Sequence, residues 1–102
     1  MVANEHLHNS FTLGRVFTTP GALEAMGASG ETPADFLSRH AEMDWGRVPP
    51  EDAVLNNQAV DNGDRILSAY DTREGVRLWV ITERVDDSGH RQATTILLPQ
   101  EY

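Results

Sequence analysis

The spacing of the apolar residues changes at Arg65, and this change limits what the chain can fold into. Before Arg65, apolar residues recur at helical spacing, as Phe36, Leu37 and Ala41 do. After it they alternate every second residue, which is typical of strands. Helices grouped first and strands grouped last predict an α+β fold, with short helices packed on one face of a three- to four-stranded antiparallel sheet.

Three segments that contain proline mark the expected helix starts. Thr19-Pro20 and Thr32-Pro33 place a capping threonine before a proline, which loses no hydrogen bond at the first helical position. Pro49-Pro50 precedes two acids, which the helix dipole favours in the first turn. We expect helices over 20–26, from 33 to before Asp44, and from 50 to Gly63. The apolar face of the third is expected to comprise Ala53, Leu55, Ala59 and Val60.

The second half of the chain predicts a three-stranded meander over 66–70, 76–83 and 92–98, to which a segment over 11–17 adds a fourth strand. Val76, Leu78 and Val80 are expected on the core face of the sheet. Trp79 and Ile81 then lie on the opposite face, which is too apolar to face water. We expect either the N-terminal segment or a second copy of the protein to cover that face, and the polar N-terminal segment favours a homodimer.

The 102 residues fit one domain over 10–102, preceded by a flexible arm over 1–9. No apolar run approaches the roughly 20 residues that a membrane span needs. The chain has no cysteine, and its first residues do not resemble a signal peptide. These features predict a cytoplasmic protein with no membrane contact.

Charge is the clearest functional signal in the sequence. Sixteen acidic residues oppose eight basic ones, all of them arginine, for a net charge of −8. Between residues 18 and 64 nine acids oppose two arginines, a local net charge of −7. Such a chain repels nucleic acids and anionic membranes, and it favours a basic protein surface as its partner.

No catalytic motif, phosphate loop or zinc motif occurs, and we expect no cofactor and no metal site. His40 falls on the apolar stripe of the second expected helix, which favours a hydrogen-bonded structural histidine over a catalytic base. Trp45 follows that helix, and the sequence leaves two interpretations open: a lid over the core, or an exposed anchor for a partner.

Several motifs resemble a group of small acidic bacterial proteins encoded on plasmids and integrated mobile elements. The matching stretches are Thr19-Pro20-Gly21-Ala22-Leu23-Glu24-Ala25, Asp44-Trp45-Gly46, Leu78-Trp79-Val80-Ile81-Thr82-Glu83 and Thr94-Thr95-Ile96-Leu97-Leu98-Pro99 with Glu101-Tyr102. The resemblance implies no catalytic residues. Its genetic context implies a counter-defence role, such as that of an anti-CRISPR or anti-restriction inhibitor.

The leading hypothesis is therefore a non-enzymatic inhibitor whose acidic helical layer occupies a basic, nucleic-acid-binding surface of a host defence complex. Carboxylates spaced along helices can mimic phosphates, because a basic groove responds chiefly to charge and spacing. Acidity that serves only solubility is the alternative without a partner. Two further alternatives are a small nuclease or toxin-like enzyme that uses His40 or Glu83, and an antitoxin or regulatory partner. The expected partner-binding residues are Glu24, Glu31, Asp35, Glu42, Asp44, Trp45, Glu51, Asp52 and Asp61.

Overall fold

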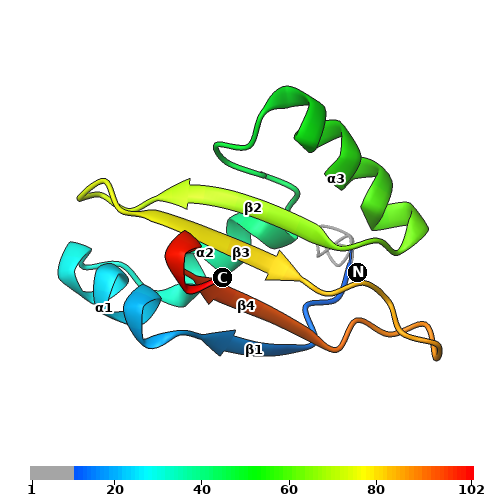
Figure 1. The fold of residues 1–102 in the computed structure, drawn as a ribbon, viewed down its shortest axis with the longest axis horizontal. Helices are drawn as coiled ribbons and strands as arrows, with labels where there is room; N and C mark the ends of the chain where they lie inside the picture. Colours follow the sequence, from blue (N-terminus) through cyan, green and yellow to red (C-terminus); the bar gives the residue numbers. More distant parts are fainter. Residues whose placement is uncertain (1–10) are drawn as a thin grey trace, which may run out of the picture.

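The structure is a computed structural model, and it describes residues 11–102. Its elements follow the predicted order, with helices first and most strands last, which confirms the α+β class (Figure 1). The flexible arm expected over 1–9 lies outside the described residues. In chain order the elements are β1 (Arg15–Thr18), α1 (Pro20–Ser29), α2 (Pro33–Ala41), α3 (Pro50–Asn62), β2 (Ile66–Asp71), β3 (Arg77–Thr82), β4 (Ala93–Leu97) and η2, a 3₁₀ turn (Pro99–Glu101).

The four strands form one sheet in the order β1-β4-β3-β2. The last three make the predicted antiparallel meander, with Tyr70 opposite Leu78 and Val80 opposite Ile96. The expectation of a purely antiparallel sheet is wrong at β1, which pairs parallel to β4. The reason is the long crossover: three helices separate β1 from the meander, so β1 meets the last strand rather than the next one.

β1 is also shorter than the expected strand over 11–17. It begins at Arg15, after Gly14 adopts a φ of +66° and brings the chain against the backbone of Arg91. A Cβ atom at Gly14 would lie 2.5 Å from the Arg91 carbonyl oxygen, so only glycine fits. Phe11, which the sequence placed in the strand, is instead a buried core residue that is 8% exposed.

The main core lies between the sheet and helices α1 and α2, which lie on the side of the sheet away from η2 (Figure 1). Leu78 and Val80 are fully buried there, as predicted. The same prediction is wrong for Val76, which precedes β3 and is 38% exposed. Its amide donates to the Thr72 hydroxyl, so Val76 belongs to the turn before the strand. Met26 and Phe36 are the largest apolar side chains that the helices contribute to this core.

A chain of buried hydrogen bonds crosses the sheet beneath the helices. His40 of α2 is fully buried, and its Nδ1 and Nε2 atoms lie 2.6 Å from Ser68 Oγ and 2.8 Å from Thr82 Oγ1. The Thr82 hydroxyl lies 2.7 Å from that of Thr94, which donates to the Leu13 carbonyl oxygen. These bonds join α2, β2, β3, β4 and the segment before β1. The predicted structural histidine is thereby confirmed.

The opposite face of the sheet is partly covered by the end of the chain itself. The rings of Trp79 and Tyr102 meet edge to face with centroids 5.8 Å apart, and Ile81 is only 4% exposed. η2 is anchored by Glu101, whose carboxylate accepts hydrogen bonds from the Thr19 hydroxyl and the Gly21 amide. The sequence prediction considered an N-terminal cover and a second copy but not this C-terminal turn.

None of the helices within residues 11–102 combines the length and apolarity needed to cross a membrane.

Candidate partner-binding surface

Helix α3 lies along the outer edge of β2, which it contacts through both polar and apolar side chains (Figure 1). The side-chain amide of Asn56 donates to the Leu67 carbonyl oxygen at 2.8 Å and accepts from the Leu67 amide at 3.2 Å. Asn56 thus replaces a neighbouring strand at a sheet edge that would otherwise leave these groups unpaired. Ala59, which is 3% exposed, and the partly buried Ala53 and Val60 form the apolar part of the inner face, as predicted.

This polar contact overturns the expected position of Leu55. The sequence placed Leu55 on the inner face of the third helix, but it is 60% exposed, and the neighbouring Asn56 is buried in its place. The physical reason is that two backbone groups of Leu67 need partners, which an amide supplies and a leucine does not. Val54 is exposed beside Leu55, at 53%.

The outer face of α3 therefore combines an apolar centre with acidic ends. Its exposed residues recur at helical spacing, from Glu51 through Val54, Leu55 and Gln58 to Asp61. At 1.5 Å per residue, Glu51 and Asp61 are separated by roughly 15 Å along the helix. Asp52 is exposed next to Glu51, and the helix contains no basic residue. We call Glu51, Asp52, Val54, Leu55, Gln58 and Asp61 the α3 surface.

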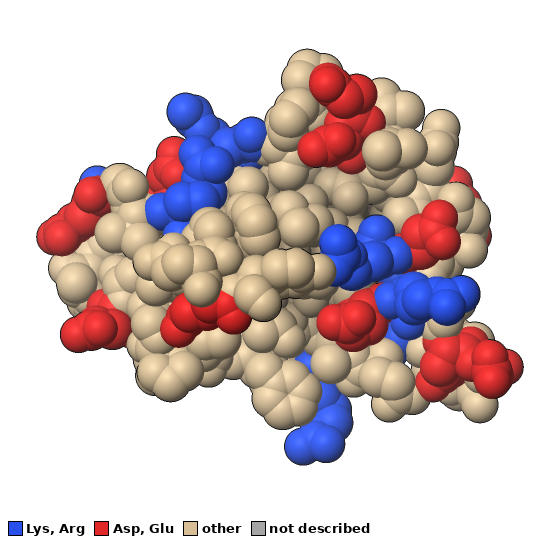
Figure 2. Space-filling model, in the orientation of Figure 1, with Lys and Arg blue, Asp and Glu red and all other residues tan. Residues whose placement is uncertain are grey.

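A shallow groove of about 250 Å³ adjoins the α3 surface on the side of the sheet. Asp52 and Arg65 contribute charged groups to its lining, and Leu55 and Leu67 contribute apolar ones. In Figure 2, acidic side chains lie over α3 at the top of the view, whereas the centre of the sheet face is largely uncharged. The α3 surface and this groove together offer a partner both carboxylates and apolar contact area.

Three acids of the predicted set are used by the chain's own structure. Glu31 accepts hydrogen bonds from the Ser29 hydroxyl and the Arg73 amide, and these bonds lower the pKa of its carboxyl group. Asp35 accepts from the Thr32 amide and closes the capping box of α2. Asp44 is paired with Arg39 at 2.7 Å, and this hydrogen bond lowers its pKa.

The other two acids of the set lie on different helices. Glu24 is exposed on α1, and Glu42 is exposed at the C-terminal cap of α2. The structure thus places Glu51, Asp52 and Asp61 on one helix and distributes the remaining predicted acids over α1, α2 and the loops that follow them.

Trp45 is a core residue rather than an exposed anchor. Its side chain is 6% exposed and packs with Phe11 and Ile66, while its indole Nε1 donates to Asn57 Oδ1 at 2.9 Å. The next residue, Gly46, forms a bridge with Ala69 at the edge of β2. Of the two interpretations of Trp45, the lid over the core is confirmed and the exposed anchor is wrong.

His40 has no surface from which to act on a substrate. It is fully buried between the rings of Phe11 and Trp45, and both ring nitrogens already have hydroxyl partners. Burial, with a smaller contribution from the positive charge of Arg91, lowers the pKa of His40 to about 4. The imidazole is therefore neutral at pH 7, and the acid–base role that the enzyme alternative gave it is not available. Glu83, the other residue in that alternative, is exposed just beyond β3.

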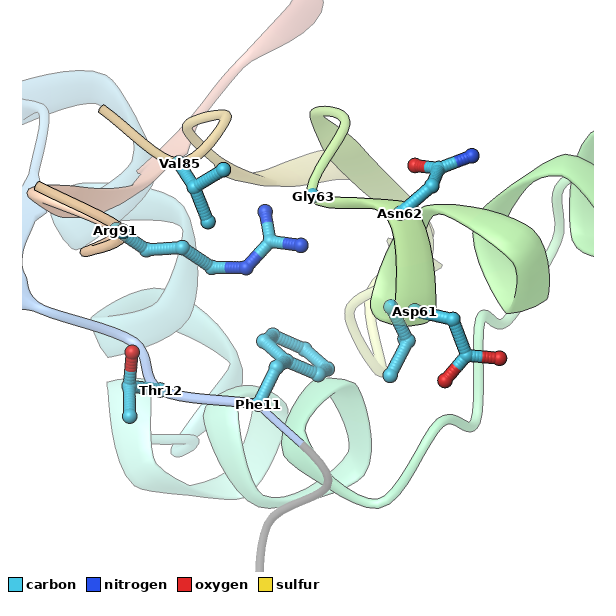
Figure 3. A pocket seen from close by; sticks show the side chains of 9 residues that line it. Phe11, Thr12, Asp61, Asn62, Gly63, Val85 and Arg91 are labelled. Carbon is cyan, nitrogen blue, oxygen red and sulfur yellow. The ribbon is translucent and has the colours of Figure 1, made fainter. Parts of the chain in front are cut away.

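A pocket of about 340 Å³ lies at the C-terminal end of α3 (Figure 3). Arg91 reaches across it toward this end of the helix, above the ring of Phe11. The guanidinium donates to the carbonyl oxygens of Ala59, Asp64 and Glu83 at 2.8 to 2.9 Å. Arg91 is only 6% exposed and forms no ion pair with a carboxylate in residues 11–102.

Arg91 therefore caps α3 at its C-terminus, where the helix dipole favours a positive charge. Sequence reasoning missed this role, since a buried arginine gives no apolar periodicity. The only hint was the turn position of Arg91 next to His90. The pocket itself includes Asp61 from the predicted set, whose side chain points away from Arg91 in Figure 3.

Comparisons with models of known protein families, with curated proteins and with solved structures find no match to this chain. The resemblance to acidic proteins of mobile elements stays an expectation.

Proposed function

We propose that this protein is a non-enzymatic inhibitor that binds, through the α3 surface, a basic nucleic-acid-binding surface of a host defence complex. The observation that carries the proposal is the composition of that surface: three exposed carboxylates around two exposed apolar side chains. None of the side chains of Glu51, Asp52 and Asp61 forms a hydrogen bond or ion pair with residues 11–102. Their charge is therefore free to act on a partner.

The two kinds of group have different roles in this proposal. The carboxylates attract lysine and arginine side chains that otherwise hold phosphates, and they speed and orient the encounter. Val54 and Leu55 supply the desolvated contact that charge alone does not give, because exposed ion pairs contribute little affinity. A basic groove that also contains apolar side chains would fit this combination. The cytoplasm, where defence complexes meet nucleic acid, is the proposed location.

Reversing the charge of the α3 surface tests the proposal. We expect the triple variant Glu51→Lys, Asp52→Lys and Asp61→Lys to weaken partner binding by at least about tenfold, and more at low salt. The measurement is affinity capture from a bacterial lysate, with release of the captured protein by double-stranded DNA and quantification by mass spectrometry. A supporting result is a nucleic-acid-binding protein that the wild type captures, that DNA releases, and that the triple variant fails to capture.

A matched control separates the α3 surface from net charge. Glu74, Glu83 and Asp87 are exposed and lie outside α3. Replacing all three by lysine changes the net charge from −8 to −2, the same change as in the test variant. The control should keep its partner. If both variants lose it equally, or if DNA releases no captured protein, the proposal is wrong.

A further inference from the structure

The two edges of the sheet are protected to different extents. On the outer side of β2, the Ala69 amide donates a hydrogen bond to the Trp45 carbonyl, and the Ala69 carbonyl accepts one from the Arg47 amide. The Leu67 amide and carbonyl form hydrogen bonds with the side chain of Asn56. β1 forms the other edge, and within residues 11–102 no element pairs with its outer side (Figure 1). Among the described residues the sheet therefore has one open edge, and an open edge is able to pair with another strand.

The backbone groups on the open edge can be assigned from the pairing of β1 with β4. The amides of Arg15 and Thr19 donate to the carbonyls of Gln92 and Ile96. Because successive residues of a strand direct their backbone groups to opposite sides, the amides and carbonyls of Val16 and Thr18 point outward. Val16 is 43% exposed and Phe17 is 46% exposed, on opposite faces of this short strand.

We infer that β1 is a self-association edge, through which two copies of this protein pair their β1 strands antiparallel about a two-fold axis at Phe17. Val16 of each copy then lies opposite Thr18 of the other, and their outward amides and carbonyls form four hydrogen bonds. The two Phe17 rings become direct cross-strand neighbours on the same face, a favourable aromatic pair. The two four-stranded sheets join into one continuous sheet.

Charge complementarity favours a second copy as the occupant of this edge. The same register places Arg15 of one copy opposite Thr19 of the other. The Thr19 hydroxyl donates a hydrogen bond to the carboxylate of Glu101, so a carboxylate lies beside that position. Arg15 has no ion-pair partner among residues 11–102 and stacks over the Phe17 ring, 5.3 Å from its centroid. The two-fold axis creates this Arg15–Glu101 contact twice, as an isologous interface requires.

The first described residue, Phe11, lies away from this edge, in the core cluster that includes Ile66 of β2. Phe11 lies on the helix-covered side of the sheet, where its ring packs against His40 and Trp45. The proposed pairing also places the helices of both copies on the same side of the joined sheet. The strand order then places the two α3 helices at the two far edges of the joined sheet. The inference does not depend on what the α3 surface binds.

The mass of the full chain in solution tests the self-association edge. We expect light scattering to show a dimer of the 11.3 kDa chain that dissociates on dilution. Phe17→Lys places two like charges across the axis and should weaken the dimer by at least about tenfold. Leu55→Lys is the matched control, since Leu55 is similarly exposed but lies on α3, and it should leave the dimer intact. Circular dichroism checks that both variants keep the fold.

Cysteine cross-linking tests the register itself, because the chain contains no cysteine of its own. In the proposed pairing the two Cα atoms at position 17 lie about 4.5 Å apart, within the range of a disulfide. Those at position 16 are diagonal neighbours about 7 to 8 Å apart, at the limit of that range or beyond it. Phe17→Cys should therefore oxidise to a covalent dimer much faster than Val16→Cys. A monomeric wild type, a dimer insensitive to Phe17→Lys, or equal cross-linking at both positions would overturn the inference.

Discussion

Replacing Arg91 by methionine should lower the free energy of unfolding by about 3 kcal/mol, because three backbone carbonyl oxygens lose their charged donor at once. The oxygens belong to Ala59, Asp64 and Glu83, which lie at the end of α3, just before β2 and just beyond β3. Methionine preserves most of the side-chain volume, so the loss measures the hydrogen bonds rather than a cavity. Urea unfolding followed by circular dichroism gives the value.

Arg84→Met is the matched control for this experiment. Arg84 is exposed and makes no ion pair within residues 11–102, so its replacement should change stability by no more than about 0.5 kcal/mol. If Arg91→Met also stays within that margin, Arg91 does not cap α3, and its position in the pocket needs another explanation.

Acidification from pH 7 to pH 5 should destabilise the protein, because of His40. Burial lowers the pKa of His40 to about 4 in the folded protein, against 6.5 for an ordinary histidine. Between these values the unfolded chain binds a proton that the folded chain does not, so stability falls as pH falls. The contribution of the neutral His40 to the free energy of unfolding is fully present above about pH 6.5. About 2 kcal/mol of this contribution should be lost between pH 7 and pH 5.

His40→Gln isolates this effect, since glutamine keeps polar atoms near Ser68 and Thr82 but does not titrate. Urea unfolding of both proteins at pH 7, 6 and 5 gives the comparison. The free energy of unfolding of the wild type should fall from pH 7 to pH 5. That of the variant should be lower at pH 7 and should change much less with pH. Parallel pH profiles for the two proteins would show that His40 is not the group responsible.

Local signals in the sequence predicted most of the fold. Thr19-Pro20 and Thr32-Pro33 mark the starts of α1 and α2, because proline at a helix start acts through its immediate neighbours. The end of α1 was predicted at Gly27, but the helix continues to Ser29. Gly27 fits within the helix, whereas Gly30 adopts the left-handed φ of 74° that ends it.

The features that the sequence did not predict depend on contacts between distant segments. The parallel pairing of β1 with β4 joins residues nearly eighty positions apart, and neither strand alone indicates its partner. The same holds for the candidate site. Asn56 is buried in preference to Leu55 only because the edge of β2 needs an amide there. The sequence showed the negative charge of the 18–64 segment. It did not show which of these acids form ion pairs or hydrogen bonds within the fold, as Asp44 does with Arg39.

The most direct test of the proposed function is whether the protein and nucleic acid exclude each other on the captured partner. The partner is bound to a fluorescent DNA duplex that it recognises, the protein is added in increasing amounts, and fluorescence anisotropy reports the fraction of DNA still bound. Our account predicts that the wild type releases the DNA completely, and that the triple variant at Glu51, Asp52 and Asp61 needs at least about ten times more protein to do so. A ternary complex, in which the partner holds the protein and keeps its DNA, would contradict the account.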